Sequence, residues 1–210
     1  MGRRLPPIVW LDGWSETNNQ DGQEVRPIFT IHAGEYLVAT EIERAFPQLQ
    51  IWIPSKDTGV DLLVTDRQQA KVASLQVKFS KDYLGAANSA PSPAVASTGW
   101  WTFQRKKIAT SPSDYWVLVL YQFQSRQFDF LVIPPSELLA RYDRIASGQV
   151  SIQSYFTVTA AAKKRCWETR GLDKASKAAV EAGTFTNPDR EFSQYLNAWP
   201  FKSTKTRPAV

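Results

Sequence analysis

The sequence has one histidine and one cysteine among its 210 residues, and this scarcity excludes several kinds of chemistry. A metal site built from several histidines cannot form, and Cys166 alone makes neither an internal disulfide nor a cysteine-cluster metal site. A single cysteine fits a reducing, cytoplasmic compartment. The phosphate-binding glycine loops and the Gly-x-Ser-x-Gly elbow of serine hydrolases are absent too. Any hydrolytic chemistry would therefore rest on carboxylates, lysine and a hard metal ion.

Long apolar runs are also missing, since no stretch approaches the roughly 18 residues needed to span a bilayer. Arg3 and Arg4 are not followed by the apolar segment of a signal peptide. The apolar fraction of 43% and the charged fraction of 21% are those of a globular protein. We therefore expect a cytoplasmic protein with no membrane partner.

The net charge of +5 is confined to one end of the chain. Residues 150–210 hold 10 Lys and Arg against 5 Asp and Glu, whereas the two signs balance over residues 1–149. One interpretation is a basic face for a phosphate backbone. A second interpretation is a dimerisation element. The third is an ordinary solvated surface.

Hydrophobic periodicity and turn signals predict a mixed α/β fold. The expected elements are a helix at 33–46, strands at 50–53, 60–65 and 71–79, a loop at 84–99, a helix at 100–109, strands at 115–123 and 128–133, a helix at 135–144, a strand at 154–159 and one or two further helices. Through residue 144 the order is α, β, β, β, α, β, β, α, which the resemblance described below matches to a mixed central sheet of at least four strands flanked by helices. We divide the chain into an N-terminal arm (1–30), a core (31–149) and a basic C-terminal extension (150–210).

The most informative segment is the expected hairpin of Val60–Thr65 and Lys71–Phe79. If the two runs pair antiparallel about the polar turn between them, Asp61 lies opposite Gln76, and opposed residues point to the same face. Lys78, two positions further along, shares that face because side chains alternate along a strand. A carboxylate, an amide and an ammonium group are therefore expected together on one face of the hairpin.

This set of side chains suits phosphodiester hydrolysis by a metal-activated water. Mg²⁺, with Mn²⁺ as a substitute, prefers oxygen ligands, which Asp61, the Gln76 side chain and the Val77 backbone carbonyl would supply. Glu35 lies on the apolar line of its helix and would add a carboxylate directly or through a water. Lys78 would orient or deprotonate the attacking water, or stabilise the charge on the phosphate.

These residues resemble a known family. The matching segments are Gly34-Glu35, Thr58-Gly59-Val60-Asp61-Leu62-Leu63-Val64 and Leu75-Gln76-Val77-Lys78. They are similar to the PD-(D/E)XK nuclease superfamily, in the branch with Gly-x-Asp and Gln-x-Lys, near Holliday junction resolvases and small restriction and homing endonucleases. Two positions depart from the pattern: Val60 replaces the proline, and Gln76 replaces the second acid.

The resemblance covers about residues 30–133 and implies a restriction-endonuclease-like core. It implies that Asp61 and Gln76 are metal-ligand positions, that Lys78 is the catalytic lysine and that Glu35 is the helix acid. The expected activity is Mg²⁺-dependent cleavage of DNA, and a homodimer would suit double-strand cutting. The candidate DNA-binding residues are Lys56, Gln104, Lys107, Lys163, Lys164 and Arg165.

Two other classes of function stay open at this point. A nucleic-acid-binding module on the same fold that has lost activity is the main alternative, because Gln76 replaces an acid. A protein-interaction domain with a chance motif would predict no binding of divalent ions at all. His32 is interpreted as a helix cap or surface group, and Trp100, Trp101 and Phe103 as packing residues of a helix.

Overall fold

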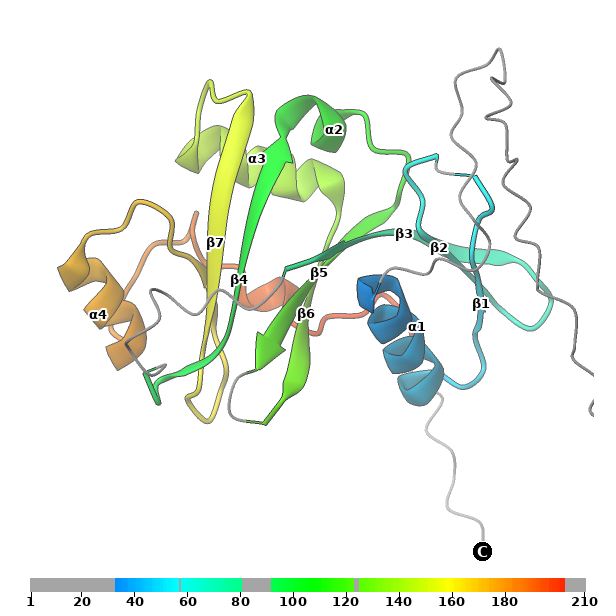
Figure 1. The fold of residues 1–210 in the computed structure, drawn as a ribbon, viewed down its shortest axis with the longest axis horizontal. Helices are drawn as coiled ribbons and strands as arrows, with labels where there is room; N and C mark the ends of the chain where they lie inside the picture. The colour runs from blue at the N-terminus through cyan, green and yellow to red at the C-terminus, as the bar shows by residue number, and fades with distance from the viewer. Residues whose placement is uncertain (1–32, 57, 81–91, 123–124, 203–210) are drawn as a thin grey trace, which may run out of the picture.

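The computed structural model describes residues 33–56, 58–80, 92–122 and 125–202. Within these ranges the chain forms a mixed sheet of eight strands and four α-helices (Figure 1). The elements are α1 (Ala33–Ala45), β1 (Gln50–Trp52), β2 (Leu62–Thr65), β3 (Lys71–Phe79), β4 (Val95–Gln104), α2 (Arg105–Ala109), β5 (Tyr115–Gln122), β6 (Gln127–Ile133), α3 (Pro135–Ile145), β7 (Ser151–Thr159), β8 (Cys166–Glu168), α4 (Lys174–Ala182) and the 3₁₀ turn η1 (Ser193–Tyr195). The expected mixed α/β class is confirmed.

The sheet divides into two branches at β5. The strand order is β1-β2-β3-β5-β4-β7-β8, and β6 also pairs with β5. One edge of β5 carries β6, while the other carries β3 in parallel at residues 115–119 and meets β4 only at Tyr121 and Gln122. Consequently two branches meet the same edge of β5 at its opposite ends: β3 with β2 and β1 at the start of the strand, and β4 with β7 and β8 at its end (Figure 1).

Helix α1 covers the first branch on one face. Its Val38 and Ile42 are fully buried in a core with Leu75 and Val77 of β3. Gly34 allows the helix to start in close contact with the strand, because a Cβ at this position would lie 2.7 Å from the Cβ of Phe79. The first turn of α1 is therefore fixed beside the end of β3.

A second core lies on the opposite face and joins both branches. It contains Trp116 and Leu118 of β5, Tyr142 of α3 and Phe156 of β7. The N-terminus of α3 follows its sequence signals, since Pro135 stands in the first turn, where the backbone N–H that proline lacks has no intrahelical partner. The site considered below lies where this core meets β2 and β3.

The expected helix at 100–109 is wrong in its first half. Val95–Gln104 is strand β4, paired along its length with β7, and only Arg105–Ala109 is helical. Burial alternates from residue to residue, as in a strand: Trp101 and Phe103 lie in the core, while Trp100 and Thr102 are exposed. Residues 95–99 of the expected loop therefore belong to the sheet, and residues 84–91 lie outside the described ranges.

The C-terminal part of the chain is integrated into the sheet. Strand β7 pairs with β4 over Ser151–Thr159, and Ile152, Phe156, Cys166 and Phe192 share the core of β5 and α3. Strands β7 and β8 therefore share a core with β4, β5 and α3. The expected arm at 1–30, together with His32, lies outside the described residues.

In the described ranges, no helix is both long enough and apolar enough to cross a bilayer.

Candidate metal site on the β2–β3 hairpin

The hairpin has the register that the sequence predicts. Leu62 pairs with Leu75 and Leu63 with Ser74, and the backbone N–H of Asp61 donates to the Leu75 carbonyl oxygen at 2.8 Å. Continuing this pairing by one residue places Asp61 opposite Gln76. A register shift occurs only at the turn end of the hairpin, between Val64 and Thr65, and does not reach the candidate site.

The Asp61 carboxylate is held by the backbone of β3. The residue is only 7% exposed, and its Oδ2 accepts a hydrogen bond from the Val77 N–H at 2.7 Å. In an antiparallel pair the N–H and C=O of one residue face the same neighbouring strand. The Val77 carbonyl therefore lies on the β3 edge that faces Asp61, so a carboxylate and a backbone oxygen occur together.

Gln76 and Lys78 point to the face of β3 opposite α1. Their register partners on β5 are Trp116 and Leu118, which belong to the second core. The Lys78 Nζ lies 5.7 Å from the centroid of the Trp116 ring, although Lys78 pairs with Leu118 in the sheet. The lysine therefore leans back along the strand toward the level of Gln76, and the aromatic ring stabilises its charge.

The chain entering the site is anchored by the loop after α2. Gly59 has a φ of +81°, which favours glycine, and its carbonyl accepts a hydrogen bond from the Ser113 hydroxyl at 2.7 Å. A Cβ on Gly59 would lie 3.2 Å from Cδ of Pro112. This hydrogen bond was not predictable from local sequence patterns, because Gly59 and Ser113 are 54 residues apart.

Asp114 joins the start of β5 to β3. Its Oδ2 accepts hydrogen bonds from both the backbone N–H and the hydroxyl of Ser74 at 2.7 Å, and it forms an ion pair with Lys71 at 2.9 Å. Burial raises the pKa of the Asp114 carboxyl, but the bonds from Ser74 and Lys71 outweigh it and leave the pKa below its ordinary value. Asp114 thus fixes the strand that carries Gln76 and Lys78.

Glu35 occupies the first turn of α1 and is only 3% exposed. The helix packs on the face of β3 that carries Leu75 and Val77, whereas Gln76 and Lys78 lie on the other face. The Glu35 backbone therefore lies beside the end of β3, next to the point where Gly34 meets Val77 and Phe79. The hairpin register puts Asp61, Gln76 and Lys78 on one face, and Glu35 is a buried acid on the neighbouring helix.

The donor set fits a magnesium-like ion better than a zinc-like one. Across the described ranges, no group of three or more His, Cys, Asp or Glu side chains is arranged to hold a metal ion. Mg²⁺ does not require such a group, because it commonly binds one or two carboxylates and retains several waters. Asp61 with the oxygens of Gln76 and Val77 matches that preference.

The candidate DNA-binding residues are distributed over three regions. Lys56 is exposed in the loop between β1 and β2, near the entry to the hairpin in sequence. Gln104 ends β4 and donates to the Ser151 hydroxyl oxygen at 3.3 Å, and Lys107 is exposed on α2. Gln104 therefore ends a strand of the β4–β7 branch and does not lie within the helix expected at 100–109.

The basic run after β7 is largely engaged within the protein. Lys164 Nζ contacts both carboxylate oxygens of Asp129 at 2.9 and 3.1 Å, and Arg165 pairs with Glu191 while stacking on Trp167. Lys163 is exposed. Lys164 and Arg165 therefore have structural partners, and Lys163 is the member of the run that presents its charge to solvent.

Comparisons with protein-family models, with curated proteins and with solved structures find no match to this chain.

Proposed function

We propose that this protein is a metal-dependent nuclease that hydrolyses DNA phosphodiester bonds at the β2–β3 hairpin. The observation that carries the proposal is the hairpin register, which aligns Asp61 with Gln76 and places Lys78 on the same face. The resemblance of these segments to PD-(D/E)XK nucleases supports it, as do the sheet and helices around the hairpin. A restriction-endonuclease-like core is part of this proposal.

Each residue has a chemical role in the proposed reaction. Asp61, the side-chain oxygen of Gln76 and the Val77 carbonyl would hold Mg²⁺, which when bound activates water and neutralises charge on the phosphate. The Val77 N–H orients the Asp61 carboxylate. Lys78, held over Trp116, would donate to a phosphate oxygen or accept a proton from water. Glu35 would add a carboxylate directly or through a water.

The main alternative is a module that binds nucleic acid but does not cut it. Gln76 favours this alternative, since a neutral amide binds a divalent cation less strongly than a carboxylate. The Gln76→Glu variant, which restores the acid, distinguishes a nuclease from a module that only binds nucleic acid. We expect it to bind Mg²⁺ more tightly than the original chain and to retain cleavage.

The test is cleavage of supercoiled plasmid, branched DNA and RNA with Mg²⁺ or Mn²⁺. We expect Asp61→Asn and Lys78→Met to lower the metal-dependent rate by about 100-fold or more. Matched controls are Glu181→Gln and Lys177→Met, which remove the same charges from exposed positions on α4. These controls should cut at the original rate.

Each other outcome contradicts part of the proposal. DNA binding without cleavage, unchanged in Gln76→Glu, would favour the inactive module. Cleavage that survives both Asp61→Asn and Lys78→Met would place the reaction elsewhere in the molecule. Cleavage of RNA alone would replace DNA as the substrate.

A further inference from the structure

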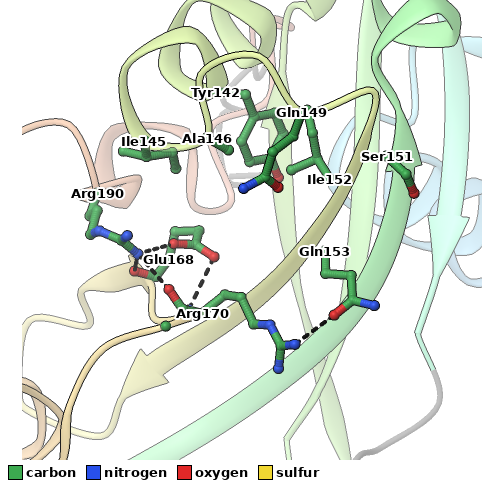
Figure 2. Close-up of a pocket in the computed structure, with 11 residues that line it drawn as sticks. Tyr142, Ile145, Ala146, Gln149, Ser151, Ile152, Gln153, Glu168, Arg170 and Arg190 are labelled. Carbon is green, nitrogen blue, oxygen red and sulfur yellow. Dashed lines mark hydrogen bonds and ion pairs between the residues drawn. The ribbon is translucent and has the colours of Figure 1, made fainter.

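A pocket of about 520 Å³ lies in the other branch of the sheet, where the end of α3 meets the start of β7 (Figure 2). Strand β8 pairs with β7 only at Phe156, Thr157 and Val158, so the edge of β7 near Gln153 borders this pocket. In the sheet order, β5 and β4 separate β7 from β3. The pocket is therefore distinct from the hairpin site, and the inference below does not depend on the proposed nuclease activity.

The acidic group of the pocket is already satisfied by the protein. Glu168 Oε1 accepts hydrogen bonds from the Ser154 hydroxyl at 3.2 Å and the Arg170 N–H at 3.1 Å, and Oε2 accepts from Arg190 Nη1. Burial raises the pKa of the Glu168 carboxyl, and Arg190 opposes this shift. The Arg190 guanidinium pairs with Glu168, whereas the Arg170 guanidinium contacts Gln153 and no carboxylate, so the pocket carries an excess of one positive charge.

The unused groups of the pocket are mostly hydrogen-bond donors. Arg170 Nη2 donates to Gln153 Oε1 at 2.6 Å, which also occupies the acceptor of that amide. Among the described residues, Nε and Nη2 of Arg190, Nε and Nη1 of Arg170 and Nε2 of Gln153 make no hydrogen bond. An open pocket lined in this way favours a ligand rich in acceptors, and the forked guanidinium group matches the oxygens of a phosphate.

The opposite wall provides an apolar surface. This surface is small: Ile145 and Ala146 are partly exposed across the pocket from Arg190 and Glu168, whereas Tyr142 and Ile152 beside them are buried (Figure 2). A free phosphate would use only the charged wall, whereas a nucleotide would also place its base against the apolar wall. The volume lies within the range of about 300–1,000 Å³ that is typical of small-molecule sites.

We propose that this pocket binds a nucleotide through its phosphate monoester, with Arg170 and Arg190 as the phosphate-binding residues. The same chemistry occurs in a free mononucleotide and at the phosphorylated 5′ end of a nucleic-acid strand.

The test measures binding by calorimetry to the full chain. The probes are the four nucleoside 5′-monophosphates, inorganic phosphate, and a tetranucleotide with either a 5′-phosphate or a 5′-hydroxyl. Arg170→Gln is the informative variant because Arg170 is exposed, and Lys177→Gln on α4 removes the same charge away from the pocket. We expect at least one phosphorylated probe to bind, about tenfold or more weakly in Arg170→Gln and unchanged in Lys177→Gln.

A second readout uses the original protein and does not rely on a variant that folds. The Nε–H resonances of Arg170 and Arg190 should shift on adding a phosphorylated probe and stay in place with the 5′-hydroxyl strand. A mononucleotide binding as tightly as the 5′-phosphorylated strand identifies the free nucleotide as the ligand, and tighter strand binding identifies the strand end. The proposal is overturned if no phosphorylated probe binds, if inorganic phosphate binds as tightly as all of them, or if Lys177→Gln weakens binding as much as Arg170→Gln.

Discussion

Substitution of Lys164 by methionine tests whether the basic run after β7 serves stability or nucleic-acid binding. Lys164 pairs with Asp129, which is only 1% exposed and also accepts hydrogen bonds from the Ser97 hydroxyl at 2.9 Å and the Asn197 amide at 3.1 Å. The pair joins the β7–β8 connection to β6, which lies beside β5. Removing the lysine leaves a buried carboxylate with only neutral partners.

The expected loss of stability follows from the burial of the two partners. Breaking a fully buried ion pair costs about 3–5 kcal/mol. Because the Lys164 side chain is 35% exposed, water would compensate for part of the lost interaction. We therefore expect Lys164→Met to lower the free energy of unfolding by about 2–3 kcal/mol. For a chain of this size, that corresponds to a melting temperature lower by about 4–12 °C.

Thermal and urea unfolding of Lys164→Met and Lys163→Met provide the measurement. Lys163 is the exposed neighbour, so its substitution should change stability by no more than about 0.5 kcal/mol. Adding Asp129→Asn to Lys164→Met should recover part of the loss, because the unpaired charge is removed. Equal stability of the two methionine variants would refute the structural role of Lys164. If Lys164→Met instead loses only DNA affinity, the lysine is a DNA contact.

Three further predictions concern the hairpin and the core. Gly59→Ala should lower stability by about 1–2 kcal/mol, measured by urea unfolding, because alanine is strained at the positive φ and its Cβ would contact Pro112; an unchanged midpoint would argue against this backbone conformation. The depressed pKa of Asp114 stabilises the fold above the ordinary pKa of an aspartate, about 3.9, and this contribution is lost as the pH falls through the lower pKa of the folded state. Because the Asp114 side chain is 42% exposed, Asp114→Asn should be less stable at neutral pH by only about 0.5–1 kcal/mol, and the difference should shrink in acid; a gap that does not depend on pH would contradict this. Burial raises the pKa of the Cys166 thiol, so a thiol reagent should label the native chain about 100-fold more slowly than the unfolded chain, and fast native labelling would place Cys166 outside the core.

The hairpin was predictable because the residues that determine it are close together in the sequence. The Lys71–Phe79 strand has the bounds that the sequence predicts, and the turn between it and Leu62–Thr65 spans only a few residues. Once the turn is centred, the register follows, and with it the alignment of Asp61 with Gln76. The same reasoning did not reveal that Ser113 anchors Gly59, because a contact between distant segments leaves no periodic signal.

Strand β4 was not predictable in the same way. Ser97 and Thr98 are buried, but small polar residues next to Gly99 are typical of a loop. Ser97 is buried because its hydroxyl donates to Asp129 on β6, and the strand persists because β7, far away in sequence, pairs with it. Tertiary contacts therefore override the local preference for a loop.

The charge of the C-terminal region shows most clearly what composition leaves undetermined. Counting residues 150–210 predicts a basic face, yet Lys164 and Arg165 are paired with Asp129 and Glu191. The acid that neutralises Lys164 is 35 residues away and belongs to β6, which no count over the C-terminal region includes. An excess of charge in a segment therefore becomes a binding surface only at residues that the fold leaves without an acidic partner. In the described part of this region, the exposed residues that meet that condition include Arg170, which donates to Gln153 and not to a carboxylate, and Lys163.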